Sequence, residues 1–338
     1  MRCIEMQSIG RAAVTERPVP VREPGWALVD VLACGLCGTD RHILRGEYPS
    51  RMPLVLGHEF GGRVREADPD SRWRAGDLVT IDPNIACGSC DHCRAGRVAL
   101  CPDRYALGVD IDGGLSEVVA VPETQLYAAS GIDPLHLAFI EPLACCLRGM
   151  DLAGLQGGES VAVIGGGVMG QLVVQLAALA GASRVTLITR QASRRSLAET
   201  LGATDSAAPD AADRDLGRTY DVVFECAGVL DTVAQALRLA RRGGSVILLG
   251  IPPEGATLPV SPFALVVDEL RLQGSFLNPL TQERAAAVVR DGALNLDALI
   301  SRRLTLDEVA EVLASDPGEG DIKYVVEPTG RPAVPSIP

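Results

Sequence analysis

The sequence predicts an α/β protein with two parts, a mostly β domain and a doubly wound domain with a parallel sheet. Its 338 residues are more than one hydrophobic core usually holds, which favours about two domains. Before about residue 134, short strand-like runs alternate with turns rich in proline and glycine, and no long helical pattern occurs. From residue 159 onward, strand-like and helical segments alternate, which is typical of parallel strands joined by crossover helices.

The end of the chain is expected to return to the β-rich domain. Helical patterns at 282–290 and 306–314 are followed by a strand-like run at 323–327. The α/β domain would then be inserted, with boundaries at 1–141 and 277–338 for the β-rich domain and 142–276 for the inserted one. Residues 207–214 and the proline-rich last residues look irregular, so we expect loops there.

The composition favours a small-molecule ligand. The formal net charge is −12, whereas nucleic acids and anionic membrane surfaces favour basic partners. No apolar run approaches the roughly 18 residues of a membrane span, and the first residues lack the apolar segment of a signal peptide. We therefore expect a cytoplasmic protein that binds neither nucleic acid nor membrane.

Residues 37–59 contain the side chains of a metal-assisted alcohol oxidation. Cys37 and His58 offer a thiolate and an imidazole, which are good zinc ligands. Thr39 and His42 offer a hydroxyl and a second imidazole that could pass a proton to solvent. The alternative is a buried structural cysteine and a hydrogen-bonded core histidine.

Four of the ten cysteines form a second metal motif. Their spacing is C-x2-C-x2-C-x7-C, and they are Cys87, Cys90, Cys93 and Cys101. Four thiolates so close in sequence can surround one zinc ion and leave no open position, so the site should be structural. An iron–sulfur cluster is the alternative, because closely spaced cysteines followed by proline also occur there. His92 lies inside this motif, and we expect it to face solvent.

Glu141 is an unusual carboxylate, because it precedes Pro142 inside an apolar helical stretch. A carboxylate in such surroundings is costly unless it is paired or bound to a metal. A third zinc ligand would explain it, and a salt bridge or a helix-end carboxylate is the alternative.

A dinucleotide motif follows. Gly165, Gly167 and Gly170 form G-x-G-x-x-G between a β-branched strand and a helix rich in alanine and leucine. In this context the glycines allow a tight turn, the approach of a pyrophosphate and close packing of helix on strand. The same cofactor site is expected to include the residues within the motif and at the ends of later strands, namely Val168, Met169, Cys226, Ala227 and Gly250.

The next strand indicates the cofactor type. An NAD enzyme usually places an acid at the strand end, against the ribose 2′-hydroxyl. Here Thr189 is followed by Arg190, and then by Arg194 and Arg195. Loss of the carboxylate and gain of cations favour a 2′-phosphate, hence NADP(H) over NAD(H). The alternative is that the arginines belong to a solvated helix start.

Together, these motifs resemble the zinc-dependent medium-chain dehydrogenase/reductases of the alcohol dehydrogenase superfamily, along essentially the entire chain. Gly57-His58-Glu59, followed later by Glu141-Pro142, is most similar to the polyol and sugar branch, the sorbitol-dehydrogenase-like enzymes. The resemblance implies a GroES-like catalytic domain with an inserted Rossmann domain. It also implies that Cys37 and His58 bind catalytic zinc with Glu59 or Glu141 as third ligand, and that Thr39 and His42 form the proton relay.

The expected activity is the zinc-dependent, NADP(H)-preferring interconversion of a secondary alcohol and a ketone. The substrate would be a small hydroxylated molecule, such as a sugar, polyol or (amino)cyclitol, with two zinc ions per chain and a homodimeric or homotetrameric assembly. The alternatives are an NAD-dependent polyol or threonine-type dehydrogenase and a non-catalytic dinucleotide-binding protein. A zinc-free quinone-reductase-like enzyme should lack Cys37, His58 and the cysteine motif.

Overall fold

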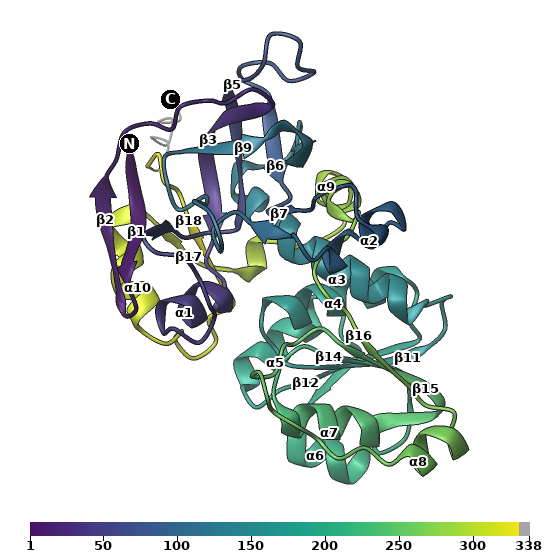
Figure 1. Cartoon of the computed structure of the whole chain (residues 1–338). Coiled ribbons are helices and arrows are strands. Elements are labelled where there is room, and N and C mark those ends of the chain that lie inside the picture. Colours follow the sequence, from purple (N-terminus) through teal and green to yellow (C-terminus); the bar gives the residue numbers. More distant parts are fainter. Residues whose placement is uncertain (331–338) are drawn as a thin grey trace.

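The computed structural model, which describes residues 1–330, arranges the strands in two large and two small sheets (Figure 1). In the β-rich domain, a large sheet has the order β10-β6-β5-β3-β18-β17, with β9 also paired to β3. A small sheet has the order β2-β1-β4, and β7 pairs with β8. The strands are β1 (Arg2–Ser8), β2 (Arg11–Glu16), β3 (Trp26–Gly35), β4 (Leu54–Val55), β5 (Glu59–Glu66), β6 (Leu78–Ile81), β7 (Asn84–Ile85), β8 (Tyr105–Ala106), β9 (Val118–Pro122), β10 (Leu126–Ala128), β17 (Ile300–Leu304) and β18 (Lys323–Val326).

Helices are few and short in this domain. They are α1 (Gly38–Leu44), α2 (Asp91–Arg94), α9 (Gln282–Arg290) and α10 (Leu306–Ala314). Helix α10 lies between β17 and β18, which are parallel and therefore need such a crossover connection. Because β18 also pairs with β3, the end of the chain completes the sheet that begins near residue 26. The domain boundaries at residues 141 and 277 stay a prediction, and residues 331–338 lie outside the described part.

The other domain is a six-stranded parallel sheet in the order β13-β12-β11-β14-β15-β16. Its strands are β11 (Ser160–Ile164), β12 (Arg184–Ile188), β13 (Asp205–Ala207), β14 (Tyr220–Glu225), β15 (Ala240–Leu248) and β16 (Arg271–Gly274). The helices are α3 (Ile140–Ala153), α4 (Val168–Leu179), α5 (Ala192–Thr200), α6 (Pro209–Asp215), α7 (Leu230–Leu239) and α8 (Pro262–Val267).

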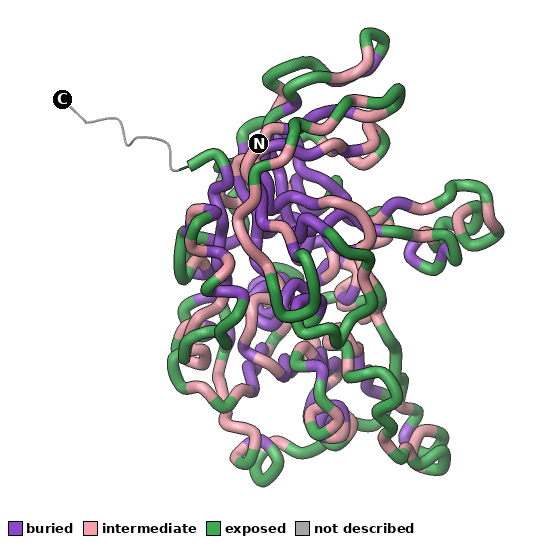
Figure 2. Tube along the Cα trace, turned by 60° about the vertical axis from the view of Figure 1, so that its left-hand side comes forward, coloured by how far each residue is buried: buried purple, intermediate pink, exposed green. Residues whose placement is uncertain are grey.

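Alternation along β11 explains how helices cover both faces of this sheet. Val161 and Val163 pack in one cluster with residues of α3 and α4. Ala162 and Ile164 pack in a separate cluster with residues of α6 and α7. Successive side chains of a strand point to opposite faces, so a strand that is apolar throughout is buried on both sides. Figure 2 colours each residue by its burial, and buried residues gather in the interior whereas exposed residues gather on the outer loops.

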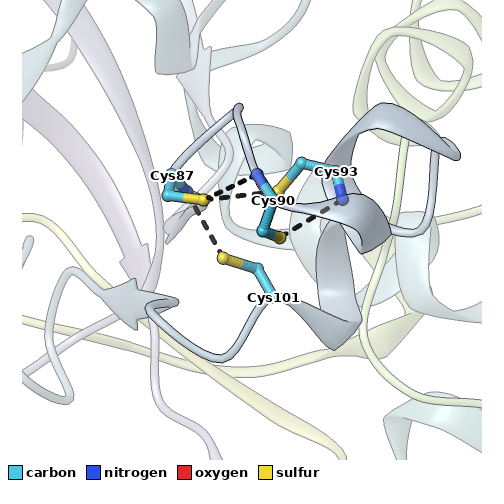
Figure 3. A group of neighbouring side chains, drawn as sticks. All are labelled: Cys87, Cys90, Cys93 and Cys101. Atoms are coloured by element: carbon cyan, nitrogen blue, oxygen red, sulfur yellow. Dashed lines mark hydrogen bonds between the residues drawn. The ribbon is translucent and has the colours of Figure 1, made fainter.

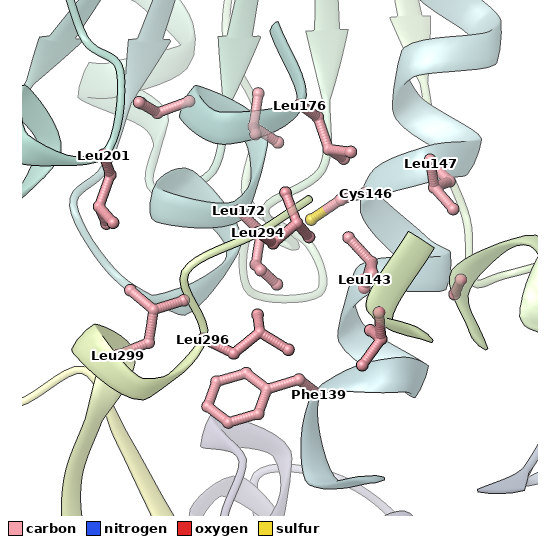
Figure 4. Packing of buried hydrophobic residues seen from close by; sticks show 14 of the residues in the cluster. Phe139, Leu143, Cys146, Leu147, Leu172, Leu176, Leu201, Leu294, Leu296 and Leu299 are labelled. Atoms are coloured by element: carbon pink, nitrogen blue, oxygen red, sulfur yellow. The ribbon is translucent and has the colours of Figure 1, made fainter. Parts of the chain in front are cut away.

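Helix α3 connects the two domains and fixes the place of Glu141. Pro142 suits the first turn because its missing N–H would have no helical partner there, and Gly154 ends the helix in the left-handed conformation. Phe139 and Leu143 pack with α4 and with residues 294–299 in one apolar cluster (Figure 4). Each fully buried leucine contributes on the order of 2 kcal/mol, so this cluster holds α3 firmly between the domains.

The expectation of a loop at 207–214 was wrong. The structure has β13 ending at Ala207 and α6 beginning at Pro209. Proline at the first helical position is preorganised for a helix, and the alanines that follow have high helix propensity. Low hydrophobicity made this helix look irregular, although Ala212 is buried against the sheet.

Candidate active site

Helix α1 presents Cys37 at its N-terminus. The backbone N–H of Cys37 donates to Asp40 Oδ2 at 2.8 Å, so the acid three residues into the helix caps its start. Asp40 is fully buried, and its Oδ1 lies 3.4 Å from His58 Nδ1. Asp40 was not among the predicted site residues, although an acid at the third position of a helix is a recognisable capping signal.

Cys37, His58 and Glu59 converge on one point. Their ligand atoms lie within 4.8 Å of one another. Gly57, with φ of +95°, turns the chain just before β5, and a Cβ there would lie 2.7 Å from the backbone of Leu115. A thiolate, an imidazole and a carboxylate so arranged form a donor set that suits zinc.

Glu141 lies near this group, but its carboxylate is not one of the converging ligand atoms found among residues 1–330. Burial raises the pKa of Glu141 to about 7, with Glu59 adding to the rise and His58 opposing it. Its Oε1 accepts a weak hydrogen bond from the Cys145 thiol at 3.5 Å. The structure therefore brings the first three predicted residues together and keeps the fourth beside them.

The surroundings of His58 favour a cation. Burial alone would lower its pKa, but the negative charges of Asp40 and Cys37 outweigh burial and raise the pKa well above the usual value. His58 Nδ1 and Asp40 Oδ1 are both buried without a hydrogen-bond partner. The negative charge of Cys37 and Asp40 around this buried imidazole is what a metal ion at the same point would balance.

Lys323 is a member of the site that the sequence analysis missed. Its side chain is 1% exposed, and its ammonium forms an ion pair with Glu59 Oε2. The pair occupies the space beside Gly35, where a Cβ would lie 2.5 Å from Glu59 Oε2 and 2.6 Å from Lys323 Cε. Because Lys323 comes from β18 at the other end of the chain, no local pattern identifies it.

Thr39 and His42 lie between the thiol of Cys37 and the protein surface. Thr39 Oγ1 lies 3.6 Å from Cys37 Sγ and is partly buried. His42 is one turn further along α1 and exposed, and its Nδ1 lies 2.5 Å from Glu47 Oε2. This order, from a partly buried hydroxyl to an exposed imidazole and carboxylate, suits proton exchange with solvent.

The glycine motif forms the turn between β11 and α4. Gly165 has φ of +108°, and a Cβ on Gly170 would lie 1.8 Å from Gly165 O, so neither position tolerates a side chain. Gly167, just before Val168 and Met169, has nothing within 4 Å of its Cβ position. The start of α4 has no side-chain cap, so its N–H groups are available to an anion such as a pyrophosphate.

Glu225 arranges the rest of this cleft and was also missed. Its Oε1 accepts hydrogen bonds from the N–H groups of Ala227 at 2.7 Å and Gly228 at 2.9 Å, and from the Thr232 hydroxyl at 2.8 Å. Cys226 and Ala227 thereby lie about 3.0 Å from the Cβ position of Gly165. A Cβ on Gly250 would lie 2.2 Å from Gly228 N, so the two strand ends meet closely.

The predicted arginines differ in their contacts. Arg195 Nη1 donates to the carbonyl oxygens of Thr189 at 2.7 Å and Arg190 at 2.8 Å, so it holds the turn after β12. Arg190 is exposed. Arg194 Nη2 donates to Asp321 O at 2.7 Å, while its Nε is buried without a partner.

The four cysteines form a compact group (Figure 3). Their Sγ atoms lie within 4.8 Å of one another, and all four thiols are free. Backbone N–H groups of Ser89 and Cys90 lower the pKa of Cys87 to about 6, which stabilises a thiolate. The N–H of Cys93 donates to Cys90 Sγ at 3.5 Å and that of Cys87 to Cys101 Sγ at 3.4 Å. His92 is exposed and lies outside the group.

Comparison with known proteins identifies the family of the chain. Residues 23–131 match the family model of the alcohol dehydrogenase GroES-like domain, and residues 168–291 match that of the zinc-binding dehydrogenase. The chain is similar to D-altritol 5-dehydrogenase of Agrobacterium fabrum, with 32% identity over 97% of this chain and 100% of the relative. It is also similar to sorbitol dehydrogenase 1 of Saccharomyces cerevisiae, with 30% identity over 91% of this chain and 92% of the relative.

A solved structure extends the similarity. A zinc-binding dehydrogenase from Sinorhizobium meliloti 1021, bound to NADP, has 46% identity and a TM-score of 0.95, covering 97% of this chain and 99% of that one. The fold and the site thus define an NAD(P)-dependent oxidoreductase with a GroES-like and a Rossmann-like domain. The chain belongs to the zinc-dependent alcohol dehydrogenase family, in the medium-chain superfamily. The predicted family and fold class are confirmed, and none of the described helices is long and apolar enough to cross a membrane.

The geometry of the cysteine group leads to a stability prediction. Cys90→Ser is expected to remove one metal ion per chain and to lower the free energy of unfolding by at least about 2 kcal/mol, because metal binding is coupled to folding. Elemental analysis and urea unfolding would measure both effects. His92→Ala, in the same loop, is the control and should change neither quantity. Unchanged metal content in Cys90→Ser would contradict the assignment.

Proposed function

We propose that this protein is a zinc-dependent, NADP(H)-preferring oxidoreductase that interconverts a secondary alcohol and a ketone of a sugar, polyol or (amino)cyclitol. The observation that carries the proposal is the convergence of Cys37, His58 and Glu59 beside the Thr39 hydroxyl. The names of the relatives, D-altritol 5-dehydrogenase and sorbitol dehydrogenase 1, support a polyol or sugar substrate. We expect the enzyme to work in the cytoplasm.

Two zinc ions per chain fit the donor sets. Cys37, His58 and Glu59 would hold the catalytic ion, since three protein ligands leave a position open for substrate. Glu59 is favoured over Glu141 as third ligand because its carboxylate lies within the group, whereas Glu141 lies beside it. Cys87, Cys90, Cys93 and Cys101 would hold the structural ion in a closed site.

The chain's own side chains would perform the proton chemistry. When bound, zinc supplies a Lewis acid for the substrate oxygen, and the nicotinamide exchanges hydride with the adjacent carbon. Thr39 accepts the hydroxyl proton during oxidation and returns it during reduction. His42, hydrogen-bonded to Glu47, exchanges that proton with solvent. Lys323 holds Glu59, and Asp40 lies beside His58 Nδ1, so the donor set is preorganised.

The surroundings of Thr189 support NADP(H). No acid follows β12, and a Cβ on Gly166 would lie 2.9 Å from Thr189 Cγ2 and 3.1 Å from Arg194 Cβ, so both residues border the glycine turn. The guanidinium of Arg195 already donates hydrogen bonds to two backbone carbonyl oxygens of the turn. Arg194 keeps an unpartnered Nε, and Arg190 is exposed, so these two are the better donors to a 2′-phosphate. The NADP-bound relative supports the same preference.

The edge of the parallel sheet supports a homodimer. Strand β16 is the last strand of its sheet, and all four of its residues are exposed. The adjacent helix α8 exposes Phe263 by 75% and Val266 by 76%. The free outer edge of β16, beside exposed apolar side chains, is an unfavourable surface for a monomer. We propose that a second copy pairs with β16 about a twofold axis, and a tetramer would need a further surface.

The function is tested by substrate screening and by a change at Thr39. Among sugars, polyols, cyclitols and aminosugars, we expect turnover of at least one polyhydroxy substrate, followed by absorbance of the reduced nicotinamide. Thr39→Val should then bind zinc and cofactor normally but slow turnover by about 10²-fold or more, the scale of lost acid–base assistance. Thr200→Val, at an exposed helix end, is the matched control. Near-normal turnover by Thr39→Val, with chemistry rate-limiting, would exclude the proposed relay.

Cofactor preference is tested by calorimetry. We expect tighter binding of NADPH than NADH, because one charge-assisted contact of about 1.5–3 kcal/mol corresponds to roughly 10- to 150-fold in affinity. Arg194→Met should weaken the binding of NADPH and leave the affinity for NADH unchanged. The double variant Thr189→Asp, Arg190→Ala should move the preference toward NADH. Arg11→Ala, on β2, should leave it unchanged. Equal or tighter NADH binding by the unmodified protein would refute NADP(H) preference.

The dimer surface is tested by light scattering with size separation. The unmodified protein is expected at twice the mass of one chain, and Val266→Glu at the mass of a single chain, because a carboxylate would be buried in the apolar contact. Val21→Glu introduces the same charge at an exposed residue of the β-rich domain and should remain dimeric. A monomeric unmodified protein, or a dimer that persists in Val266→Glu, would rule out this contact.

A further inference from the structure

The chain returns from the parallel sheet to the β-rich domain through residues 275–281, which follow β16 and precede α9. Two leucines in this segment have left-handed backbone conformations, Leu277 with φ of +57° and Leu280 with φ of +61°. Leucine rarely adopts this conformation, because its Cβ crowds the following carbonyl oxygen. Such residues persist only where neighbouring contacts hold the backbone in place.

Asn278, between the two leucines, supplies those contacts. It is 1% exposed, and its Oδ1 accepts a hydrogen bond from Asn84 Nδ2 at 2.9 Å. Its Nδ2 donates to Asp82 Oδ1 at 3.2 Å and to Gln282 Oε1 at 3.1 Å. Gln282 in turn donates to Thr80 Oγ1 at 3.1 Å. The crossing segment is therefore bound to β6, β7 and the turn between them by buried polar side chains.

Residues on both sides of the cysteine loop contact this segment. Asn84 lies on β7, just before Cys87, and Arg104 lies just before β8, after Cys101. Arg104 Nη1 donates to Asn84 Oδ1 at 3.0 Å, and its guanidinium carbon lies 5.7 Å from the ring centroid of Phe276. The two residues thus contact Phe276 and Asn278, on either side of Leu277.

The crossing segment also contacts the helix between the domains. Thr281 Oγ1 donates to Ala144 O of α3 at 2.8 Å. Helix α3 carries Glu141 in its first turn and packs against α4, which begins at the glycine motif. A displacement of residues 275–281 would therefore change the position of the cofactor helix relative to Cys37 and His58.

The cysteine loop, residues 87–101, has little secondary structure and few buried side chains to keep it ordered. Its helix α2 spans four residues, none of them buried. Cys101 and Ala99 are the buried residues of the loop between residues 87 and 101. Closure of the loop on a metal ion would therefore determine where its two base strands lie.

We infer that the cysteine loop sets the geometry of the crossing segment, with Arg104 as the positioning residue, and thereby aligns the cofactor with the catalytic side chains. The inference rests on the proposed function for the metal in the loop and for the cofactor and catalytic side chains that it would align, whereas the position of the crossing segment is measured without them. It gives the four-cysteine site a role in the alignment of the two domains, beyond local stability. Metal loss from the loop would release residues 275–281 without touching the catalytic donor set.

The test is hydrogen–deuterium exchange of the full protein without cofactor or substrate. Arg104→Met is expected to speed amide exchange at residues 275–285 by about tenfold or more, because local opening becomes easier there. Turnover should fall by about tenfold through misalignment, while metal content and NADPH affinity stay unchanged within about threefold. Arg104→Lys, which keeps a donor and a positive charge, should restore part of the protection.

Two comparisons complete the test. Arg94→Met makes the same change at an exposed arginine of the same loop and should leave exchange at residues 275–285 unaltered. Cys90→Ser, measured under conditions where it is folded, should lose the loop metal and speed exchange at the same residues. The inference is overturned if Arg104→Met exchanges like Arg94→Met, or if Cys90→Ser loses its metal without any change at 275–285. If the unmodified protein holds no metal in the loop, the proposed structural metal site is refuted. The positioning role of Arg104 is then accepted or rejected by the exchange of Arg104→Met alone.

Discussion

The buried ion pair between Lys323 and Glu59 is the interaction on which the catalytic domain depends. Glu59 and Glu141 are both buried, and their negative charges repel each other. A buried carboxylate is tolerated when it is paired and hydrogen-bonded, and its removal from water costs several kcal/mol when it is not. Lys323 supplies the compensating charge, and β18 must therefore lie against β3. The return of the chain to its first domain thus completes the sheet and also brings a positive charge to the buried carboxylates.

Charge also organises the nucleotide domain, although there the partners are backbone groups. Glu225 accepts hydrogen bonds from two backbone N–H groups and one hydroxyl, so a buried carboxylate fixes the turn that faces Gly165. Arg194 donates to the carbonyl oxygen of Asp321, in the segment before β18. Arg194, at the expected adenosine end of the cleft, is therefore hydrogen-bonded to the segment that leads into β18. Because β18 carries Lys323, this contact links the cofactor site to the site around Glu59.

Local patterns in the sequence were enough to predict the motifs. The cysteine spacing, the glycine turn after a β-branched strand and the helices at 282–290 and 306–314 all depend on neighbours within a few residues. Lys323 and Glu225 could not be found in this way, since a lysine at the start of a strand or an acid at its end becomes informative only when a distant partner is known. The helix that begins at Pro209 has a local signal, because proline at the first helical position is followed by alanines, but it is short and buries only Ala212.

Gly35 shows how tightly such distant partners restrict one another. Its Cα faces Glu59 Oε2 and Lys323 Cε at distances that leave no room for even a methyl group. Enlargement at residue 35 would require a shorter acid, which would withdraw the carboxylate from Cys37 and His58, or a shorter cation, which would leave that carboxylate without its partner. The three positions therefore restrict one another sterically. Substitutions among related sequences should be correlated across them, although they lie on three different strands.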